Sequence, residues 1–244
     1  IGDFIGNRGG AIYNGGTIGD ITGDFIGNSS GGRAAIFNNN TGTIDNITGD
    51  FIGNSASYDA GAIENIGTIG NISGDFIGNS AGSDGGAIYN HGRTIGNISG
   101  DFIGNSANKG GAIYNYSYDG TIGNITGDFL NNYVQSSSAS NFALGGAVYT
   151  RKNLTFTTNG KEHFFSGNYT EDSQGKIYNG IYVAMIDTSS PMLTFDTTSG
   201  GVWIINDNIE GGTTSINQNN QYNLSFKGDG ALNEDGLTDQ YISI

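Results

Sequence analysis

One period of the sequence, residues 74–99, reads GDFIGNSAGSDGGAIYNHGRTIGNIS. Its opening motif, Gly-Asp-Phe-Ile-Gly-Asn, recurs with its phenylalanine at Phe4, Phe25, Phe51, Phe76, Phe102 and, in a variant form, Phe129. Consecutive phenylalanines are 21, 26, 25, 26 and 27 residues apart. Self-similarity at such a period is typical of a solenoid, in which each repeat buries its apolar face against its neighbours.

Two further motifs complete the period. Gly-Gly-Ala-Ile-Tyr-Asn occurs at residues 9–14, 85–90 and 110–115, and Thr-Ile-Gly-Asn-Ile-Ser at residues 68–73 and 94–99. Each is a short segment bounded by Gly or Asn, which is the pattern of strands and turns, and no window shows the periodicity of a helix. We therefore predict an all-β chain folded as a right-handed parallel β-helix, a solenoid with three short strands per turn of about 25 residues.

The motifs lose their regularity beyond Asn132, although late copies persist as far as Asn168. No Pro-rich or Ser-rich linker separates the two halves. We predict a regular repeat β-helix over residues 1–132 and an irregular continuation of the same β-helix over residues 133–244.

Strand alternation predicts the direction of the side chains. In the segment from Ile21 to Phe25, residues 21, 23 and 25 point inward, and Thr22 and Asp24 point outward. The phenylalanines then stack at the strand spacing of about 4.8 Å, and the Asn of each Phe-x-x-Asn lies at a corner in a hydrogen-bonded ladder. In Ala-Ile-Tyr, we expect Ile inside, with Ala and Tyr outside.

Composition excludes several classes of function. The formal net charge is −14, which disfavours nucleic acid and anionic membrane surfaces as partners. The chain has no Cys, so it has no disulfide framework, thiolate metal site or Cys nucleophile. No apolar run approaches the length of a membrane span, so we expect no membrane insertion. Ile1 opens within a repeat, and we expect targeting signals to lie in a longer protein.

The alternation of Gly-Gly-Ala-Ile with Phe-x-x-Asn resembles the repeats of the chlamydial polymorphic membrane proteins and related autotransporter passengers. Clear copies cover about residues 1–168. The resemblance implies export through the bacterial outer membrane, display on the cell surface and a role mainly as an adhesin. The Gly-Asp before each Phe is more uniform here than that family requires.

One column of aromatic residues is the candidate binding surface. It consists of Tyr13, Phe37, Tyr89, Tyr114 and Tyr149, and Glu64 interrupts it. If the rings point outward, they form a stripe suited to a glycan or another protein. If they point inward, they are only core. The sequence leaves both alternatives open.

A column of aspartates is the candidate cation site: Asp24, Asp50, Asp75 and Asp101, with Asp3 and Asp128 at its ends. Stacked carboxylates repel, so they must be solvated, partly protonated or bridged by cations. Ca²⁺ suits such oxygens but needs 6–8 of them. We favour a solvated face and predict no metal site and no cofactor, because His91 and His163 each stand alone in the sequence.

Three hypotheses for the function remain. The first is an extracellular, surface-displayed adhesin or interaction rod whose partner is a protein or glycan of a host or neighbouring cell. The second is a structural stalk or self-assembling surface element that associates laterally. The third, ranked last, is a polysaccharide-active enzyme, for which Arg151, Lys152, Lys161, Glu162 and His163 are the densest polar cluster. We predict that the chain is not an enzyme, because no carboxylates converge with a base.

Overall fold

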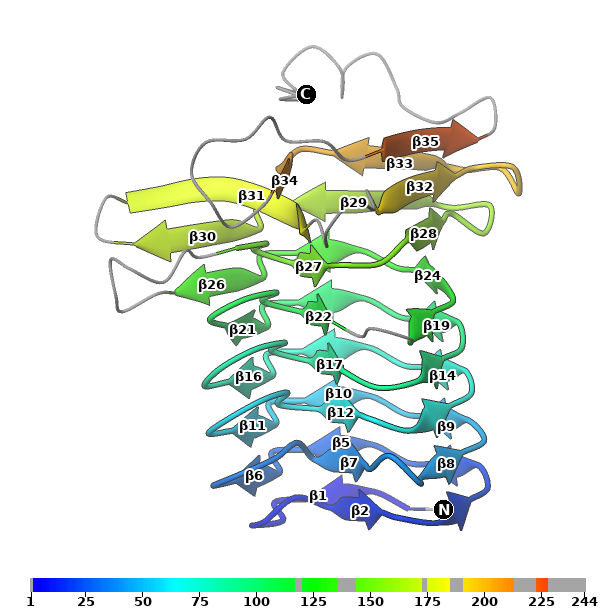
Figure 1. Ribbon diagram of the computed structural model, residues 1–244, viewed down its shortest axis with the longest axis vertical. Helices are drawn as coiled ribbons and strands as arrows, with labels where there is room; N and C mark the ends of the chain where they lie inside the picture. Colours follow the sequence, from blue (N-terminus) through cyan, green and yellow to red (C-terminus); the bar gives the residue numbers. More distant parts are fainter. Residues whose placement is uncertain are drawn as a thin grey trace.

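Short strands from successive repeats pair in parallel and in register in a computed structural model of the chain (Figure 1). The structure describes residues 2–116, 120–135, 144–172, 175–184, 191–212 and 223–227. All regular secondary structure in these residues is strand, and none of them forms a helix long and apolar enough to cross a membrane. The predicted parallel β-helix is confirmed.

Three walls enclose the core, each built from one of the three motifs. The Phe wall comprises β1 (Phe4–Ile5), β5 (Phe25–Ile26), β10 (Phe51–Ile52), β15 (Phe76–Ile77), β20 (Phe102–Ile103), β25 (Phe129–Leu130), β29 (Glu162–Ser166) and β33 (Val202–Ile205). The Tyr wall comprises β2 (Ile12–Asn14), β7 (Ile36–Asn38), β12 (Ile63–Asn65), β17 (Ile88–Asn90), β22 (Ile113–Asn115), β27 (Val148–Thr150), β31 (Gly175–Ala184) and β34 (Asn208–Gly212). The Thr wall comprises β4 (Ile21–Thr22), β9 (Ile47–Thr48), β14 (Ile72–Ser73), β19 (Ile98–Ser99), β24 (Asn124–Thr126), β28 (Leu154–Thr157), β32 (Met192–Asp196) and β35 (Asn223–Lys227).

Two further rows of short strands raise the number of strands in a regular coil from the expected three to five; one row is a separate corner sheet, and the other, the arm, is joined to the Tyr wall in one sheet through β30 (Tyr169–Asp172) and β31. The Thr-Ile-Gly-Asn-Ile-Ser motif bends at its Gly, and its first half forms a corner sheet of β3 (Thr17–Ile18), β8 (Thr43–Ile44), β13 (Thr68–Ile69), β18 (Thr94–Ile95) and β23 (Thr121–Ile122). The segment between Phe-Ile-Gly-Asn and Gly-Gly-Ala forms an arm with β6 (Ser29–Ser30), β11 (Ser55–Ala56), β16 (Ser80–Ala81), β21 (Ser106–Ala107), β26 (Tyr133–Gln135) and β30 (Tyr169–Asp172).

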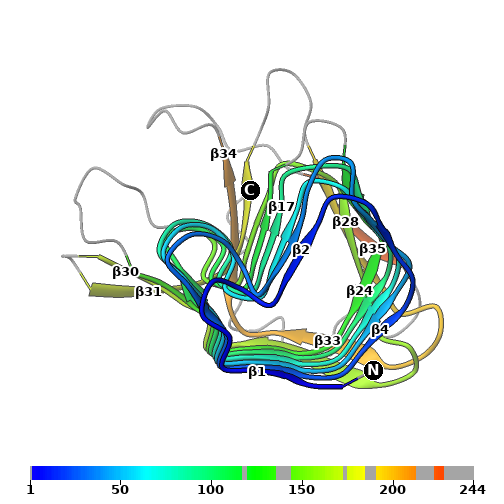
Figure 2. The same ribbon diagram turned by 90° about the horizontal axis from the view of Figure 1, so that it is seen from below.

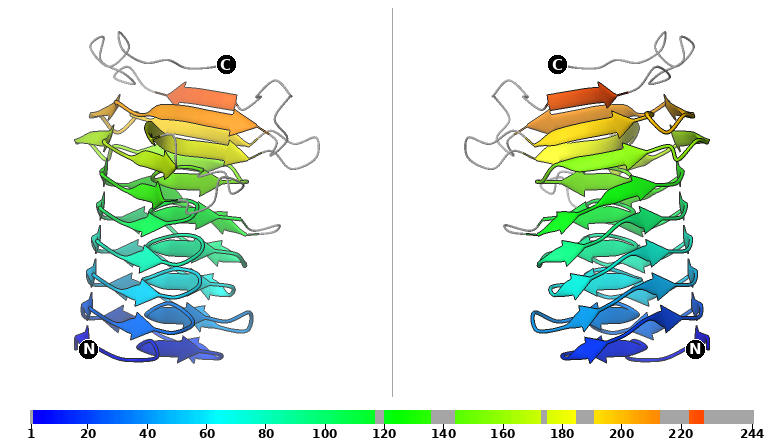
Figure 3. Two further views of the ribbon diagram at one scale, coloured as in Figure 1. Left: turned by 90° about the vertical axis from the view of Figure 1, so that its left-hand side faces the viewer. Right: turned by 90° about the vertical axis from the view of Figure 1, so that its right-hand side faces the viewer.

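Seen along its axis, the coil is triangular, and the arms project from it between the Phe wall and the Tyr wall (Figure 2). From the N-terminal end, the chain runs clockwise as it recedes from β1 through β2 to β4, so the coil is right-handed. The antiparallel hairpin of β30 and β31 extends the arm furthest from the axis. Side views show the walls as continuous stacks of strands (Figure 3).

The core is organised around a stack of phenylalanine rings on the Phe wall. From Phe4 to Phe165 the neighbouring rings are nearly parallel, with centroids 4.5–4.9 Å apart. Phe25 and every later ring of the stack are fully buried, and each burial contributes on the order of 1.5–3 kcal/mol. Inward isoleucines of the other walls fill the remaining interior, as the alternation predicts.

A buried ladder of asparagines runs beside this stack. Asn79 shows the pattern: its Nδ2 donates to Asn105 Oδ1 at 3.0 Å and to the Phe51 carbonyl at 2.8 Å. Its Oδ1 accepts the backbone N–H and the Nδ2–H of Asn54 at 3.0 and 2.9 Å. The ladder repeats from Asn28 to Asn168 and ends where Asn168 donates to Asp207. The predicted Asn ladder is therefore confirmed, and it satisfies backbone groups at the corner that would otherwise be buried without partners.

The glycine before each Asp is fixed by the backbone of the neighbouring coil. Gly23, Gly49, Gly74, Gly100 and Gly127 have φ between +139° and +157°. A Cβ at Gly74 would overlap the carbonyl oxygen of Gly49, and each of the others meets the same obstacle. The close approach of two backbones therefore requires glycine at this position.

One local expectation, for the alanines, was wrong. The alanines of Ala-Ile-Tyr are not on the outer surface: Ala62, Ala87, Ala112 and Ala147 are fully buried and belong to the main core cluster. The left-handed corner residue is the Gly before the ladder Asn, with φ near +60° at Gly53 and Gly78. Asn131 replaces that Gly in the variant motif and adopts φ +55°, which Asn tolerates.

The glycine column predicts a sharp contrast between two alanine substitutions. We expect Gly74→Ala to lower the free energy of unfolding severely, because its Cβ overlaps the Gly49 carbonyl. Gly78→Ala, four residues away, has φ +62° and open space around the new Cβ, so it should cost only about 1–2 kcal/mol. Urea unfolding of both variants would measure this, and equal losses would contradict the backbone-contact explanation.

The two kinds of Asn predict a second contrast. Asn79→Ala leaves the Asn54 N–H buried without a partner and removes the side-chain hydrogen bonds to the Phe51 carbonyl and along the ladder, so we expect a loss of about 3 kcal/mol in the free energy of unfolding. Asn97 lies on the exposed face, where its Oδ1 accepts only the Asn124 N–H at 2.9 Å. Asn97→Ala should cost less than about 1 kcal/mol. Urea unfolding measures the free energy of unfolding of both variants. Comparable losses would show that the burial of the Asn does not determine how much its removal destabilises the fold.

Candidate functional site

The aromatic column lies on the outer side of the Tyr wall, but most of its rings are covered. Tyr13 is 72% exposed, whereas Phe37, Tyr114 and Tyr149 are 5%, 4% and 2% exposed and Tyr89 is intermediate. Tyr114 and Tyr149 belong with Tyr182 to a small cluster separate from the main core. The two alternatives therefore both hold in part: the rings point outward, but further residues bury them.

Side chains from flanking segments cover the column. The Arg33 guanidinium lies 4.0 Å above the Phe37 ring, and Arg151 lies 4.0 Å above the Tyr116 ring. Tyr116 in turn stacks on Tyr114, with ring centroids 5.5 Å apart. These covering residues come from the arms and from the segments after each Asn, whose sequences vary between repeats.

A cavity of about 480 Å³ opens at the N-terminal end of this column. Its lining includes Tyr13 and Phe37, with ring centroids 5.1 Å apart, together with Gly9, Gly10, Ser30 and Arg33. The first arm holds only Arg8 between Asn7 and Gly9 and is shorter than the arm of the next coil. This size lies within the range of small-ligand sites.

Glu64 occupies the position in the column where other repeats carry an aromatic ring. Its Oε1 lies 3.1 Å from Arg33 Nη1, and among the described residues its buried Oε2 has no hydrogen-bond partner. Burial raises the pKa of Glu64 to about 7, against the opposing effect of Arg33. Burial likewise raises the pKa of Asp84 to about 6, although Lys109 opposes the shift, and raises the pKa of Asp59.

The aspartate column is held by the backbone. Asp24 Oδ1 accepts the Asp50 N–H at 2.9 Å, and Asp50 and Asp75 accept the corresponding N–H of the next coil at 2.8 Å. Each carboxylate thus faces a hydrogen-bond donor instead of only its negative neighbours, a way of relieving the repulsion that we did not foresee. The side chains remain partly exposed.

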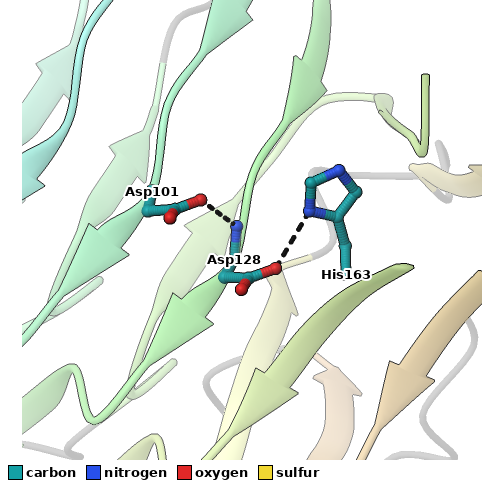
Figure 4. Close-up of side chains that lie close together, drawn as sticks. All are labelled: Asp101, Asp128 and His163. Carbon is teal, nitrogen blue, oxygen red and sulfur yellow. Dashed lines mark hydrogen bonds and ion pairs between the residues drawn. The ribbon is translucent and has the colours of Figure 1, made fainter. Parts of the chain in front are cut away.

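His163 is not alone, contrary to our sequence-based interpretation. It lies with Asp101 and Asp128 in a group whose ligand atoms are all within 4.8 Å of one another (Figure 4). Its Nδ1 is 2.9 Å from Asp128 Oδ1 and its Nε2 is 3.1 Å from the Thr158 carbonyl. A ring nitrogen that donates a hydrogen bond has no lone pair for a metal ion, so this geometry favours an ion-pair or hydrogen-bonded end to the column. Ca²⁺ binding stays an untested alternative.

The cluster of Arg151, Lys152, Lys161, Glu162 and His163 does not converge on one site. Arg151 stacks on Tyr116, Lys161 and Glu162 are exposed, and His163 is buried beside Trp203, with ring centroids 5.3 Å apart. His163 stands where earlier coils carry the glycine of Gly-Asp, and Trp203 follows it in the next coil. These side chains fill the core of the C-terminal coils.

Comparisons with known proteins leave the chain without an assigned relative. No protein-family model, curated protein or solved structure matches it. The resemblance to autotransporter passengers, the location and the function therefore remain predictions.

Sequence reasoning missed the group of Arg33, Asp59, Glu64 and Asp84. Arg33 and Glu64 are 31 residues apart, so their contact depends on the stacking of adjacent coils and on the lengths of two arms. The interruption of the aromatic column by Glu64 was the available signal, because a carboxylate in such a column needs a cation beside it.

The raised pKa values predict a pH-dependent stability. A carboxyl whose pKa is raised on folding stabilises the fold when protonated, so the free energy of unfolding should fall as the pH rises from about 5 to 8, by about 2–3 kcal/mol for Glu64. Glu64→Gln should remove much of this decline, and Asp84→Asn a further part. Chemical denaturation at both pH values tests this, with the exposed Glu162→Gln as the control. A decline unchanged in Glu64→Gln would contradict the assignment.

Proposed function

We propose that the chain is an extracellular, surface-displayed interaction rod that acts as an adhesin. The β-helix serves as a rigid scaffold, and the cavity beside Tyr13 serves as its ligand-binding site. The observation that carries this proposal is the combination of an exposed aromatic ring, a second ring, an arginine and a cavity of about 480 Å³ at one place on the Tyr wall. The resemblance to autotransporter passengers supports display on a bacterial cell surface.

The chemistry of the cavity suits a glycan. A tyrosine ring offers an apolar face to the C–H groups of a sugar and a hydroxyl to its oxygens. Ser30, the Arg33 guanidinium and the backbone of the glycines add polar groups around the rings. A net charge of −14 keeps the rod soluble and repels nucleic acid and anionic membranes.

A structural stalk is the second candidate. Tyr114 and Tyr149 are buried by their neighbours, so the aromatic column is closed in these coils. A half-exposed column of Ile26, Ile52, Ile77 and Ile103 on the Phe wall offers a surface for lateral association. Such a stalk would hold a separate binding part away from the cell.

An enzymatic function ranks below both. The lining of the cavity contains no carboxyl group. Burial raises the pKa of five described carboxyls, those of Asp59, Glu64, Asp84, Asp101 and Asp207, and none of them lines the cavity. The Glu64 side chain, whose pKa is raised to about 7, is only 7% exposed and is engaged by Arg33. Such burial keeps it from a substrate, so we propose a non-catalytic role.

Tyr13 is the residue whose removal tests the adhesin proposal. We expect the chain to bind a subset of sugars on an array of defined oligosaccharides and Tyr13→Ala to weaken that binding roughly tenfold, because the main aromatic face is lost. Tyr178→Ala, which removes a 55% exposed ring on β31, should bind as the unaltered chain does. Equal binding by the Tyr13 variant, or no binding by the unaltered chain, would contradict the proposal and favour the stalk.

A further inference from the structure

We infer that the cavity beside Tyr13 binds an acidic sugar, with the sugar ring against Tyr13 and its carboxylate on the Arg33 guanidinium, and that Glu64 controls the strength of that contact. This inference rests on the proposed function and adds the class of ligand and its regulation. It draws on the cavity, on the Arg33–Glu64 pair and on the distribution of charge around them.

The cavity lining carries a positive charge on an otherwise acidic protein. The chain has 23 Asp and Glu residues against 9 Lys and Arg, yet the cavity lining includes Arg33 and no acidic residue. Arg8 precedes the lining residue Gly9 and is itself exposed. A ligand bearing a carboxylate therefore meets complementary charge here, whereas most of the surface repels it.

Arg33 is placed to bind a second carboxylate. Its side chain is 53% exposed, and it donates one hydrogen bond, from Nη1 to Glu64 Oε1 at 3.1 Å. A guanidinium carries five N–H donors in a rigid fork. Because the group lies flat on the Phe37 ring at 4.0 Å, it is already oriented, and little conformational freedom is lost when a ligand binds.

A sugar fits the remainder of the cavity better than an apolar ligand does. The Tyr13 ring is exposed, its hydroxyl lies 3.4 Å from Asn39 Nδ2, and Ser30 also lines the cavity. Aromatic faces bordered by hydroxyl and backbone groups match the mixed surface of a sugar ring. A cavity of about 480 Å³ has room for one or two such rings.

Glu64 competes with the ligand for Arg33. The charged groups that act on its carboxyl are Arg33 and Asp59, while Phe37 and Tyr89 lie on either side of it in the ladder. Asp59 Oδ1 in turn accepts the Asp84 N–H at 3.3 Å, and the charge of His91 opposes the rise in the pKa of Asp59. Glu64 is thus the carboxyl that faces the cation of the cavity directly.

Protonation of Glu64 should therefore strengthen binding. Its pKa of about 7 means that its charge is lost between pH 8 and pH 6. Removal of that charge leaves Arg33 to the ligand and relieves the repulsion between two carboxylates on one guanidinium. By linkage, an anion that binds beside Glu64 raises the pKa of Glu64, so affinity rises as the pH falls.

Isothermal titration calorimetry with digalacturonate, and with its methyl ester as a matched neutral probe, tests the inference. We expect digalacturonate to bind the whole chain about three- to tenfold more tightly at pH 6 than at pH 8. The methyl ester should bind more weakly at pH 6 and show little dependence on pH. Both sugars stay in the same charge state over this interval, because the acid's carboxyls are ionised throughout.

Two variants assign the effect to its residues. Glu64→Gln keeps an acceptor for Arg33 but removes the charge, so at pH 8 it should bind digalacturonate as tightly as the unaltered chain does at pH 6. Arg33→Gln should abolish the preference for the acid over its ester while the ester still binds. Glu162→Gln, on an exposed strand residue, should behave as the unaltered chain. Far-ultraviolet circular dichroism confirms that each variant is folded.

The possible failures are distinguishable. If neither sugar binds but other oligosaccharides on the array do, the acidic-sugar inference fails and the adhesin proposal stands. If the acid and the ester bind equally, or if Glu64→Gln retains the pH dependence, the roles of Arg33 and Glu64 are wrong. If no sugar binds at all, the proposed function fails. Tighter binding of a glutamate-rich peptide than of the sugar would identify an acidic protein as the partner.

Discussion

The structure depends on one constraint, which is that the same side chain returns to the same place in every coil. A parallel, in-register stack puts each residue directly beside its own copy, so any residue type in a column must be able to contact itself. Phenylalanine does so by stacking its ring, and asparagine by donating its amide to the next amide. Aspartate cannot do so through its side chain alone, and Asp50 and its equivalents instead accept a backbone N–H of the following coil.

This constraint explains why much of the fold was predictable from the sequence. The Phe column, the inward isoleucines and the Asn ladder follow from alternation and from the chemistry of identical neighbours. The role of Gly74 was not predictable in the same way, because it depends on the distance between two backbones at a bend. The burial of alanines such as Ala87 was likewise not predictable, because alternation alone places them outward.

The candidate site was less predictable than the fold for a related reason. The column of Tyr13, Phe37, Tyr89, Tyr114 and Tyr149 could be located from spacing, but its exposure is decided by Arg33, Tyr116 and Arg151, which lie outside the repeated motifs. In a solenoid, a binding site is expected at positions that depart from the repeat, because the repeated side chains already contact the equivalent side chains of adjacent coils. Glu64 and the short first arm are two such breaks, and both adjoin the cavity region.

The Asn ladder also has a direction. From Asn7 to Asn132 each side-chain amide donates to the amide of the next coil toward the C-terminal end, and Asn168 donates to the Asp207 carboxylate. The Asn of a coil duplicated within the ladder would therefore meet an amide donor in the coil before it and an amide acceptor in the coil after it. A duplicated coil of Asp207 would not continue the ladder, because a carboxylate accepts hydrogen bonds but does not donate them. Duplication of a coil within the ladder would therefore lengthen a rod of this kind without breaking the chain of amides.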